Sequence, residues 1–128
     1  MDTVADMLTT LVNAQRVGKE RAAVAHSRFK EQLARLLQQK GVVADVRVQS
    51  GPQSKLIITL KYEEGRPRVR QAIRLSKPGR RLYVKSDEIP WGTKSVSTFI
   101  ISTSKGLMDE KGAREAGLGG ELVCELRR

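Results

Sequence analysis

The spacing of the apolar residues changes once along this chain, and no other feature restricts the fold as much. Along 4–12 and again along 29–37, apolar residues recur at helical intervals. Thr3 and Ser27 stand where the N-caps of these two helices are expected, and Gly41 stands where the second helix should end. After Gly41 the apolar residues alternate with polar ones, which is the period of a half-buried strand. Two helices followed by strands favour an α+β fold over a parallel α/β sheet.

The alternating residues and the turn residues between them predict the remaining elements. They indicate strands at 42–48, 56–62, 68–75, 82–84, 96–102 and 122–126, and a helical turn at 86–88. A short helix is expected after Asp109, which suits its N-cap, and should end at Gly117. Residues 63–67 (Glu-Glu-Gly-Arg-Pro) are interpreted as a hinge. We therefore expect two small lobes, a helix–helix–hairpin lobe at 1–64 and a β-rich lobe with a short helix at 65–128.

The charge of the chain indicates its class of partner. There are 24 Lys and Arg residues against 14 Asp and Glu residues, a net charge of +10. A small protein this basic usually binds a polyanion, although a basic surface can also serve solubility alone. From Gly65 to Lys85 the chain holds eight basic residues and no acidic one. The arginines from Arg66 to Arg74 are predicted to form one basic strand face that contacts phosphates.

Few residues could support catalysis or bind a metal. His26 is the only histidine and Cys124 the only cysteine, so the sequence shows neither a disulfide nor a cluster with metal-ligand spacing. Cys124 alternates with Leu122 and Leu126 and is predicted to be a core residue. Residues 117–120 lack the spacing and context of a dinucleotide loop. We expect no cofactor and no enzymatic activity. No apolar run is long enough to span a membrane and no signal-peptide pattern is present, which favours a cytoplasmic protein.

The segment Ser102-Thr103-Ser104-Lys105-Gly106 holds the residues best suited to bind RNA. Its three consecutive hydroxyl groups can each donate and accept a hydrogen bond. Lys105 supplies a charge for phosphate, and Gly106 lets the backbone itself come close. Such a loop suits irregular RNA, which is recognised by its shape and its 2′-hydroxyl groups. By composition alone, an ordinary polar turn would explain the same residues.

This segment is part of a longer pattern that closely resembles bacterial ribosomal protein S-eight, the eighth protein of the small subunit. The resemblance is carried by Asp6–Thr9, Asn13–Ala14, Leu60–Tyr62, Leu75–Tyr83, Asp87–Pro90, Ser102–Met108, Ala113–Arg114 and Gly117–Cys124. It covers essentially the whole chain. The combination of 102–106 with 117–121 is highly specific, whereas either segment alone would only be suggestive.

The resemblance implies a two-lobed α+β protein that binds the central domain of 16S ribosomal RNA early in assembly of the small subunit. Its C-terminal lobe would grip an irregular RNA helix. The contact loop would comprise Ser102, Thr103, Ser104 and Gly106, with Gly119, Gly120 and Glu121 beside it. In many bacteria the family also represses its own operon by binding a similar mRNA structure. The resemblance further implies ribosomal protein S-five as a neighbour and a single copy, a monomer, within the ribosome.

Some positions depart from the family pattern. The first helix of the family usually carries two arginines that are linked to a second RNA contact, and Thr10 and Val12 occupy those positions here. Arg16 and Lys19 are the candidates to replace them. The Gly-Leu-Gly segment that usually precedes the apolar strand is replaced by residues 95–97 (Ser-Val-Ser).

Other candidate RNA contacts lie outside the loop. Tyr83 could stack on a base, although a core tyrosine on a short strand would also fit. Trp91 could contact RNA or a neighbouring protein near Lys94, or be partly buried. Further candidates for contacts with the RNA backbone are Lys55, Lys77, Arg80 and Arg81.

Three functions would use a basic surface that binds RNA. The first is a constituent of the small ribosomal subunit that binds 16S RNA, and it is the prediction. The second is a translational repressor that uses the same surface on mRNA outside the ribosome. The third is a small RNA-processing enzyme, which would need an acid–base pair or a metal cluster. No membrane partner is expected.

Overall fold

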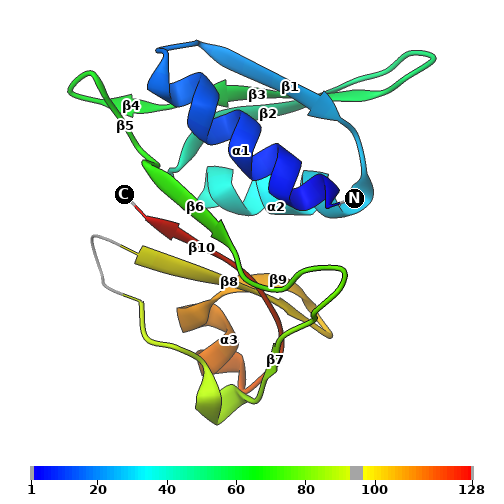
Figure 1. Cartoon of the computed structure of the whole chain (residues 1–128), viewed down its shortest axis with the longest axis vertical. Coiled ribbons are helices and arrows are strands. Elements are labelled where there is room, and N and C mark those ends of the chain that lie inside the picture. The colour runs from blue at the N-terminus through cyan, green and yellow to red at the C-terminus, as the bar shows by residue number, and fades with distance from the viewer. Residues whose placement is uncertain (1, 93–96, 128) are drawn as a thin grey trace. The chain divides into compact units, whose positions relative to one another are not determined.

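The computed structural model of the chain describes residues 2–92 and 97–127. Contacts divide the chain into two compact units, each drawn in Figure 1. The N-terminal unit is Thr3–Arg70, and the C-terminal unit is Asp2 together with the residues from Gln71 onward. Both combine helices with antiparallel sheets, which confirms the predicted α+β class.

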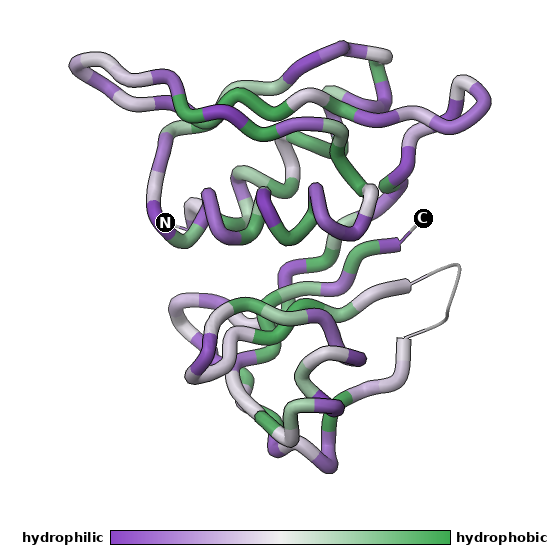
Figure 2. Tube along the Cα trace, turned by 180° about the vertical axis from the view of Figure 1, so that it is seen from behind, coloured by the Kyte–Doolittle hydropathy of each residue, from purple (hydrophilic) through white to green (hydrophobic). Residues whose placement is uncertain are grey.

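The N-terminal unit pairs two helices with a three-stranded sheet. Its elements are α1 (Thr3–Arg16), β1 (Arg21–Ala25), α2 (Arg28–Gln39), β2 (Val43–Gln49), β3 (Lys55–Leu60), β4 (Tyr62–Glu63) and β5 (Arg66–Pro67). The sheet has the order β1-β3-β2, with α1 against β1 and α2 against β2. Its core is mainly apolar and includes Met7, Leu8, Leu11, Leu33, Leu37, Leu56 and Ile58, while Gln15 and Lys30 are the polar residues buried in this unit among those described. In Figure 2 the hydrophobic stretches lie along these strands and helices, while the β2–β3 and β4–β5 turns are hydrophilic or neutral.

The local predictions for this unit are largely confirmed. Ser27 caps α2, since its Oγ accepts a hydrogen bond from the Lys30 N–H at 3.1 Å. Gly41 follows that helix with φ +74°, a left-handed conformation that favours glycine. The predicted hairpin is β2–β3.

Two features of the N-terminal unit differ from the prediction. Strand β1 was not predicted, because its alanines have low strand propensity and its strand conformation depends on pairing with β3. Residues 63–67, predicted as a hinge, belong to the β4–β5 hairpin, whose turn is residues 64–65. Glu64 (φ +52°) and Gly65 (φ +76°) are both left-handed, as a tight two-residue hairpin turn requires.

The C-terminal unit is a five-stranded antiparallel sheet with one short helix. Its elements are β6 (Gln71–Arg74), β7 (Tyr83–Val84), the 3-10 turn η1 (Ser86–Glu88), β8 (Ser97–Thr103), β9 (Gly106–Asp109), α3 (Glu110–Ala116) and β10 (Gly120–Arg127). The strand order is β6-β10-β8-β9, and β7 also pairs with β10. Helix α3 packs on β8 and β9 over a core cluster of Ile89, Ile101, Ala113 and Leu122.

Most elements of this unit were predicted. Asp109 caps α3 by accepting the Gly112 N–H at 2.8 Å, and Gly117 ends the helix with φ +68°. Strand β8 matches the strand predicted at 96–102, of which residue 96 lies outside the described residues, as do 95 and Lys94. Strand β9 was not predicted. The strand predicted at 68–75 is shorter, because only Gln71–Arg74 pairs with β10.

Candidate nucleic-acid interface

The hairpin tip between β8 and β9 presents two polar residues to solvent. Thr103 pairs with Gly106 in the ladder, and Ser104 and Lys105 form the exposed turn between them. The Thr103 hydroxyl holds the turn, since it donates to the Gly106 carbonyl at 2.7 Å and accepts the Lys105 N–H at 3.1 Å. Gly106 has φ +110°, which L side chains rarely adopt. The Ser104 hydroxyl and the Lys105 ammonium therefore remain available to a partner.

Strand pairing brings Tyr83 onto the same sheet as this tip. On either side of β10, Glu121 lies opposite Tyr83 of β7 and Ser102 of β8. Directly opposed residues of an antiparallel sheet share one face and lie close together. Tyr83 is 71% exposed, so it is not the core tyrosine that the sequence left open. Its ring is free to stack on a planar group.

Gly119 and Gly120 are required by the close approach of backbones. A Cβ atom on Gly120 would lie 2.0 Å from the Ser102 carbonyl oxygen, and one on Gly119 would lie 2.3 Å from the Val84 carbonyl oxygen. No side chain fits at either position. These glycines thus have a structural role in joining β10 to β7 and β8, and a contact with RNA remains a prediction.

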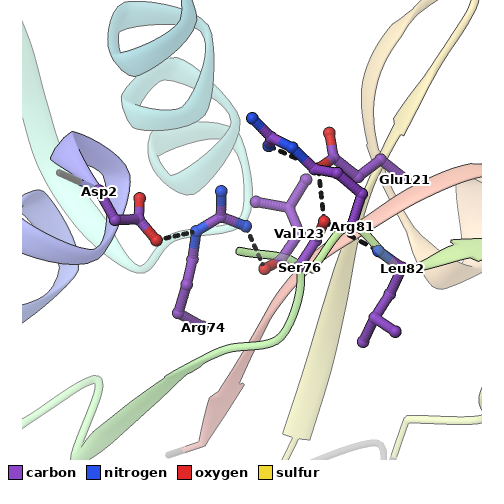
Figure 3. A network of polar contacts seen from close by, with 7 residues as sticks. All are labelled: Asp2, Arg74, Ser76, Arg81, Leu82, Glu121 and Val123. Carbon is purple, nitrogen blue, oxygen red and sulfur yellow. Dashed lines mark hydrogen bonds and ion pairs between the residues drawn. The ribbon is translucent and has the colours of Figure 1, made fainter. Parts of the chain in front are cut away.

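Glu121 is held inside a polar network, which Figure 3 shows. Its Oε2 accepts a hydrogen bond from the fully buried Ser76 hydroxyl at 2.5 Å and one from Arg81 at 2.9 Å. The Ser76 Oγ in turn accepts the Leu82 N–H at 3.1 Å. Burial raises the pKa of the Glu121 carboxyl, but the bonds from Ser76 and Arg81 and the charges of Arg81 and Arg74 outweigh it and lower that pKa below its usual value.

This network gives Ser76 and Arg81 roles that the sequence alone did not predict. Ser76 was not predicted as a functional or structural residue, because a single serine after a strand carries no sign of burial. Arg81, predicted to contact RNA, neutralises Glu121. Direct contacts of Arg81 and Glu121 with RNA remain predictions.

The predicted basic face of residues 66–74 does not form, and two of its arginines are used internally. Arg74 pairs with Asp2 at 3.0 Å and donates to the Val123 carbonyl at 2.8 Å (Figure 3). Arg68 pairs with Glu63 and also donates to a backbone carbonyl, that of Gly41, at 3.3 Å. The alternation of arginines predicted one strand, but residues 66–67 pair with β4 and residues 71–74 pair with β10, in separate sheets. Arg68 and Arg74 therefore pair with different acids.

The remaining predicted cations are exposed. Lys77 and Arg80 are the ends of a four-residue turn closed by two backbone hydrogen bonds, Lys77 N–H to the Arg80 carbonyl at 3.1 Å and Arg80 N–H to the Lys77 carbonyl at 2.9 Å. Within residues 2–92 and 97–127, neither residue nor Lys105 forms an ion pair. Lys55 is also exposed, at the start of β3 in the N-terminal unit.

The structure also shows where the other residues singled out from the sequence lie. Cys124 is buried, and burial raises the pKa of its thiol to about 12, so it is protonated at neutral pH. The His26 ring pairs with Glu31 at 2.7 Å beside the cap of α2. Trp91 is 78% exposed, and the Arg114 guanidinium lies over its ring, 3.4 Å from the centroid.

The described part of the chain offers no site for a metal ion or a membrane. Over residues 2–92 and 97–127, no group of three or more His, Cys, Asp or Glu side chains is placed to hold a metal ion. Among the helices described, none combines the length and apolar character needed to cross a bilayer.

Comparison with known proteins identifies the relatives of the chain. A family model described as "Ribosomal protein S8" matches residues 2–126. A curated relative from Teredinibacter turnerae, named small ribosomal subunit protein uS8, is 42% identical over 123 residues, which cover 96% of this chain and 95% of the relative. Relatives of the same name from Vibrio cholerae and Neisseria meningitidis are 42% and 44% identical, with the same coverage. All three are named as ribosomal proteins and not as enzymes.

Proposed function

This chain belongs to the ribosomal protein S8 family, and from that premise we propose that it is a non-catalytic protein of the small ribosomal subunit that binds the central domain of 16S ribosomal RNA and supports subunit assembly. The names of its relatives support a place in the small subunit. The RNA target is the part that the family resemblance implies. The proposal also includes a cytoplasmic location and ribosomal protein S-five as a neighbour.

One observation carries the choice of the binding surface. A turn that exposes a hydroxyl group and an ammonium group, Ser104 and Lys105, lies on the same sheet as the exposed ring of Tyr83. Hydroxyl groups can bond 2′-hydroxyl groups and phosphates, and an aromatic ring can stack on an unpaired base. Irregular RNA offers all three of these groups at once, whereas a regular duplex keeps its bases stacked.

Electrostatic attraction would bring the RNA to this surface. The chain has a net charge of +10, and Lys77 and Arg80 stand exposed in the turn before β7. Contacts of this kind position the RNA without reading its sequence. Specificity would then come from the fit of the hairpin tip and Tyr83 to one distorted helix.

Binding of a 16S central-domain fragment by purified protein tests the proposal. Ser104→Ala should weaken binding about tenfold, because one hydrogen bond to a charged group is worth about 1.5 kcal/mol or more. Gly106→Val should weaken it further, since valine strains a backbone at φ +110°. Ser54→Ala, at an exposed serine of the N-terminal unit, is the matched control. Parental affinity in both hairpin variants would reject this surface.

The same surface would serve a second function if it also bound operon mRNA, as the family resemblance implies. An mRNA structure similar to the rRNA site would then compete with the 16S fragment for one surface. Competition that is lost in Ser104→Ala and Gly106→Val would support repression through this site. Failure of any operon mRNA to compete would leave the ribosomal function alone.

A further inference from the structure

Trp91 borders a hollow beside α3 in the C-terminal unit. The hollow has a volume of about 480 Å³ and is lined by Trp91, Gly92, Glu110, Lys111, Arg114 and Glu115. Tryptophan is on average a well buried residue, whereas Trp91 is 78% exposed. Tryptophan and arginine are also among the residues that contribute most to the affinity of protein–protein interfaces. An exposed tryptophan beside a hollow therefore indicates a surface that a partner covers.

The aromatic edge of this hollow is held in place before any partner binds. The Arg114 guanidinium lies over the Trp91 ring, and its Nη2 donates to the Pro90 carbonyl at 3.0 Å and to the Ile89 carbonyl at 3.3 Å. Arg114 thus covers one face of the ring, and the rest of the ring reaches solvent. Side chains that are already ordered lose little conformational entropy when they bind a partner.

The two segments around this hollow are acidic, although the chain as a whole is basic. Residues 85–92 contain η1 and Trp91, residues 109–116 contain α3 and its cap, and η1 packs against α3. Together they carry five acidic and three basic side chains, a net charge of −2. Since the whole chain carries +10, the rest carries +12, and counting Lys94, which the structure does not describe, would leave these segments negative.

We call residues 85–92 and 109–116 the acidic surface. Two of its carboxylates, Asp87 and Glu115, are exposed and form no ion pair within residues 2–92 and 97–127. Negative charge repels a phosphate backbone and attracts a cation. The acidic surface is therefore suited to a basic protein segment and not to RNA.

The acidic surface and the proposed RNA surface belong to opposite faces of one sheet. Helix α3 packs against β8 and β9, over Ile101 and Leu122 (Figure 1). Ser102 and Glu121 adjoin these two residues in their strands, so their side chains point to the other face, which Tyr83 shares. A partner on α3 would thus leave the Tyr83 face open to RNA.

We propose that the acidic surface, with Trp91 and Arg114 at its centre, is a docking site for a lysine- and arginine-containing segment of another protein. A cation of that segment would pair with Asp87 or Glu115, and an arginine would also stack on the part of the Trp91 ring that Arg114 leaves open. The proposal rests on the proposed function, because the partner would be another protein of the small subunit, and it adds the class of partner and the surface that it meets.

Photo-crosslinking in small subunits assembled with the full chain tests the docking site. The aromatic photo-crosslinker p-benzoylphenylalanine replaces Trp91 in one variant and Tyr83 in a second. After irradiation, position 91 should be linked to a protein, in a peptide that carries lysine or arginine, and position 83 should be linked to RNA. Mass spectrometry identifies the linked peptide, and nuclease digestion identifies linked RNA. A link from position 91 to RNA, or no link at all, would overturn the docking site.

Charge reversal at Glu115 shows whether the attraction is electrostatic. Glu115→Lys should lower the yield of the protein crosslink at position 91 about fivefold, because an attractive contact becomes a repulsive one, and Glu115→Gln should lower it less. Glu64→Lys makes the same change at an exposed acid of the N-terminal unit and should keep the parental yield. Equal yields in Glu115→Lys and Glu64→Lys would reject the docking site.

The two crosslinking positions separate this proposal from the proposed function. If position 83 is linked to RNA and position 91 is linked to no protein, the docking site is rejected and the proposed function stands. If position 91 is linked to a protein and position 83 is not linked to RNA, the docking site stands and the proposed RNA surface is rejected. Urea midpoints equal to that of the parent show that the charge variants are folded, as expected for an exposed side chain at Glu115.

Discussion

Replacing Ser76 with alanine should destabilise the C-terminal unit while it leaves the exposed groups of Ser104, Lys105 and Tyr83 in place. The Ser76 hydroxyl is fully buried, donates to Glu121 and accepts the Leu82 N–H. A hydrogen bond to a charged group contributes about 1.5–3 kcal/mol, and a donor left unpaired at a half-buried position costs about 1 kcal/mol. Glu121 keeps its bond from Arg81, so the loss is partial. We expect the free energy of unfolding to fall by about 2–4 kcal/mol.

Urea unfolding followed by the fluorescence of Trp91 measures this loss. Trp91 is the only tryptophan of the chain and lies in the C-terminal unit, so its signal reports on that unit. The midpoint should fall while the slope m stays unchanged, because the surface exposed on unfolding is the same. The exposed Ser104 is the matched control, and Ser104→Ala should change stability by less than about 0.5 kcal/mol.

The two serines should therefore have opposite effects. Ser76→Ala should lower stability and leave the RNA affinity of the folded protein close to that of the parent. Ser104→Ala should lower the RNA affinity and leave the stability close to that of the parent. A loss below about 0.5 kcal/mol in Ser76→Ala would refute the reasoning, because a buried hydroxyl with two partners cannot be removed at so small a cost. Equal destabilisation by both variants would refute it as well.

Two further predictions concern the same sheet. Gly120→Ala should destabilise the protein by about 1–3 kcal/mol or more, since its Cβ would lie 2.0 Å from the Ser102 carbonyl oxygen. Thermal unfolding measures this loss. A variant as stable as the parent would contradict the close approach of β10 and β8. The pKa of Glu121 is lower in the folded protein than in the unfolded chain, where it is near 4.5. Its carboxylate therefore stabilises the fold at pH values above about 4.5, and this contribution is lost as the pH falls through the pKa of the folded state. Glu121→Gln should thus be less stable than the parent at pH 7, and the difference should shrink below about pH 4; an unchanged difference would contradict the ion pair with Arg81.

The features that the sequence predicted well are those set by neighbouring residues in the chain. Ser27 and Asp109 cap their helices, and Gly41 and Gly117 end them, because a cap needs only residues within one turn. The hydroxyl-rich segment 102–106 was predicted as a polar loop from its local composition, and the structure places Ser104 and Lys105 in an exposed turn.

The features that were missed depend on partners distant in the chain. Strand β1 exists because β3 pairs with it, and its alanine-rich sequence carries no strand pattern of its own. Ser76 is buried where its hydroxyl group donates to Glu121, which lies 45 residues later in the chain. The arginine face predicted for 66–74 was wrong because the alternation shows where side chains lie on an ideal strand and does not show which acids they meet.

Acids within the fold decide how much of the positive charge is left for a partner. Three of the eight cations between Gly65 and Lys85 are engaged, Arg68 by Glu63, Arg74 by Asp2 and Arg81 by Glu121. Each of these carboxylates stabilises the fold and lowers the positive potential that attracts a polyanion. These carboxylates therefore raise the stability of the fold and lower its affinity for RNA. Replacing one of them with a neutral residue should lower the free energy of unfolding and leave its cation free to bind a phosphate. The unpaired cations then mark the places where a phosphate can bind without first displacing a carboxylate.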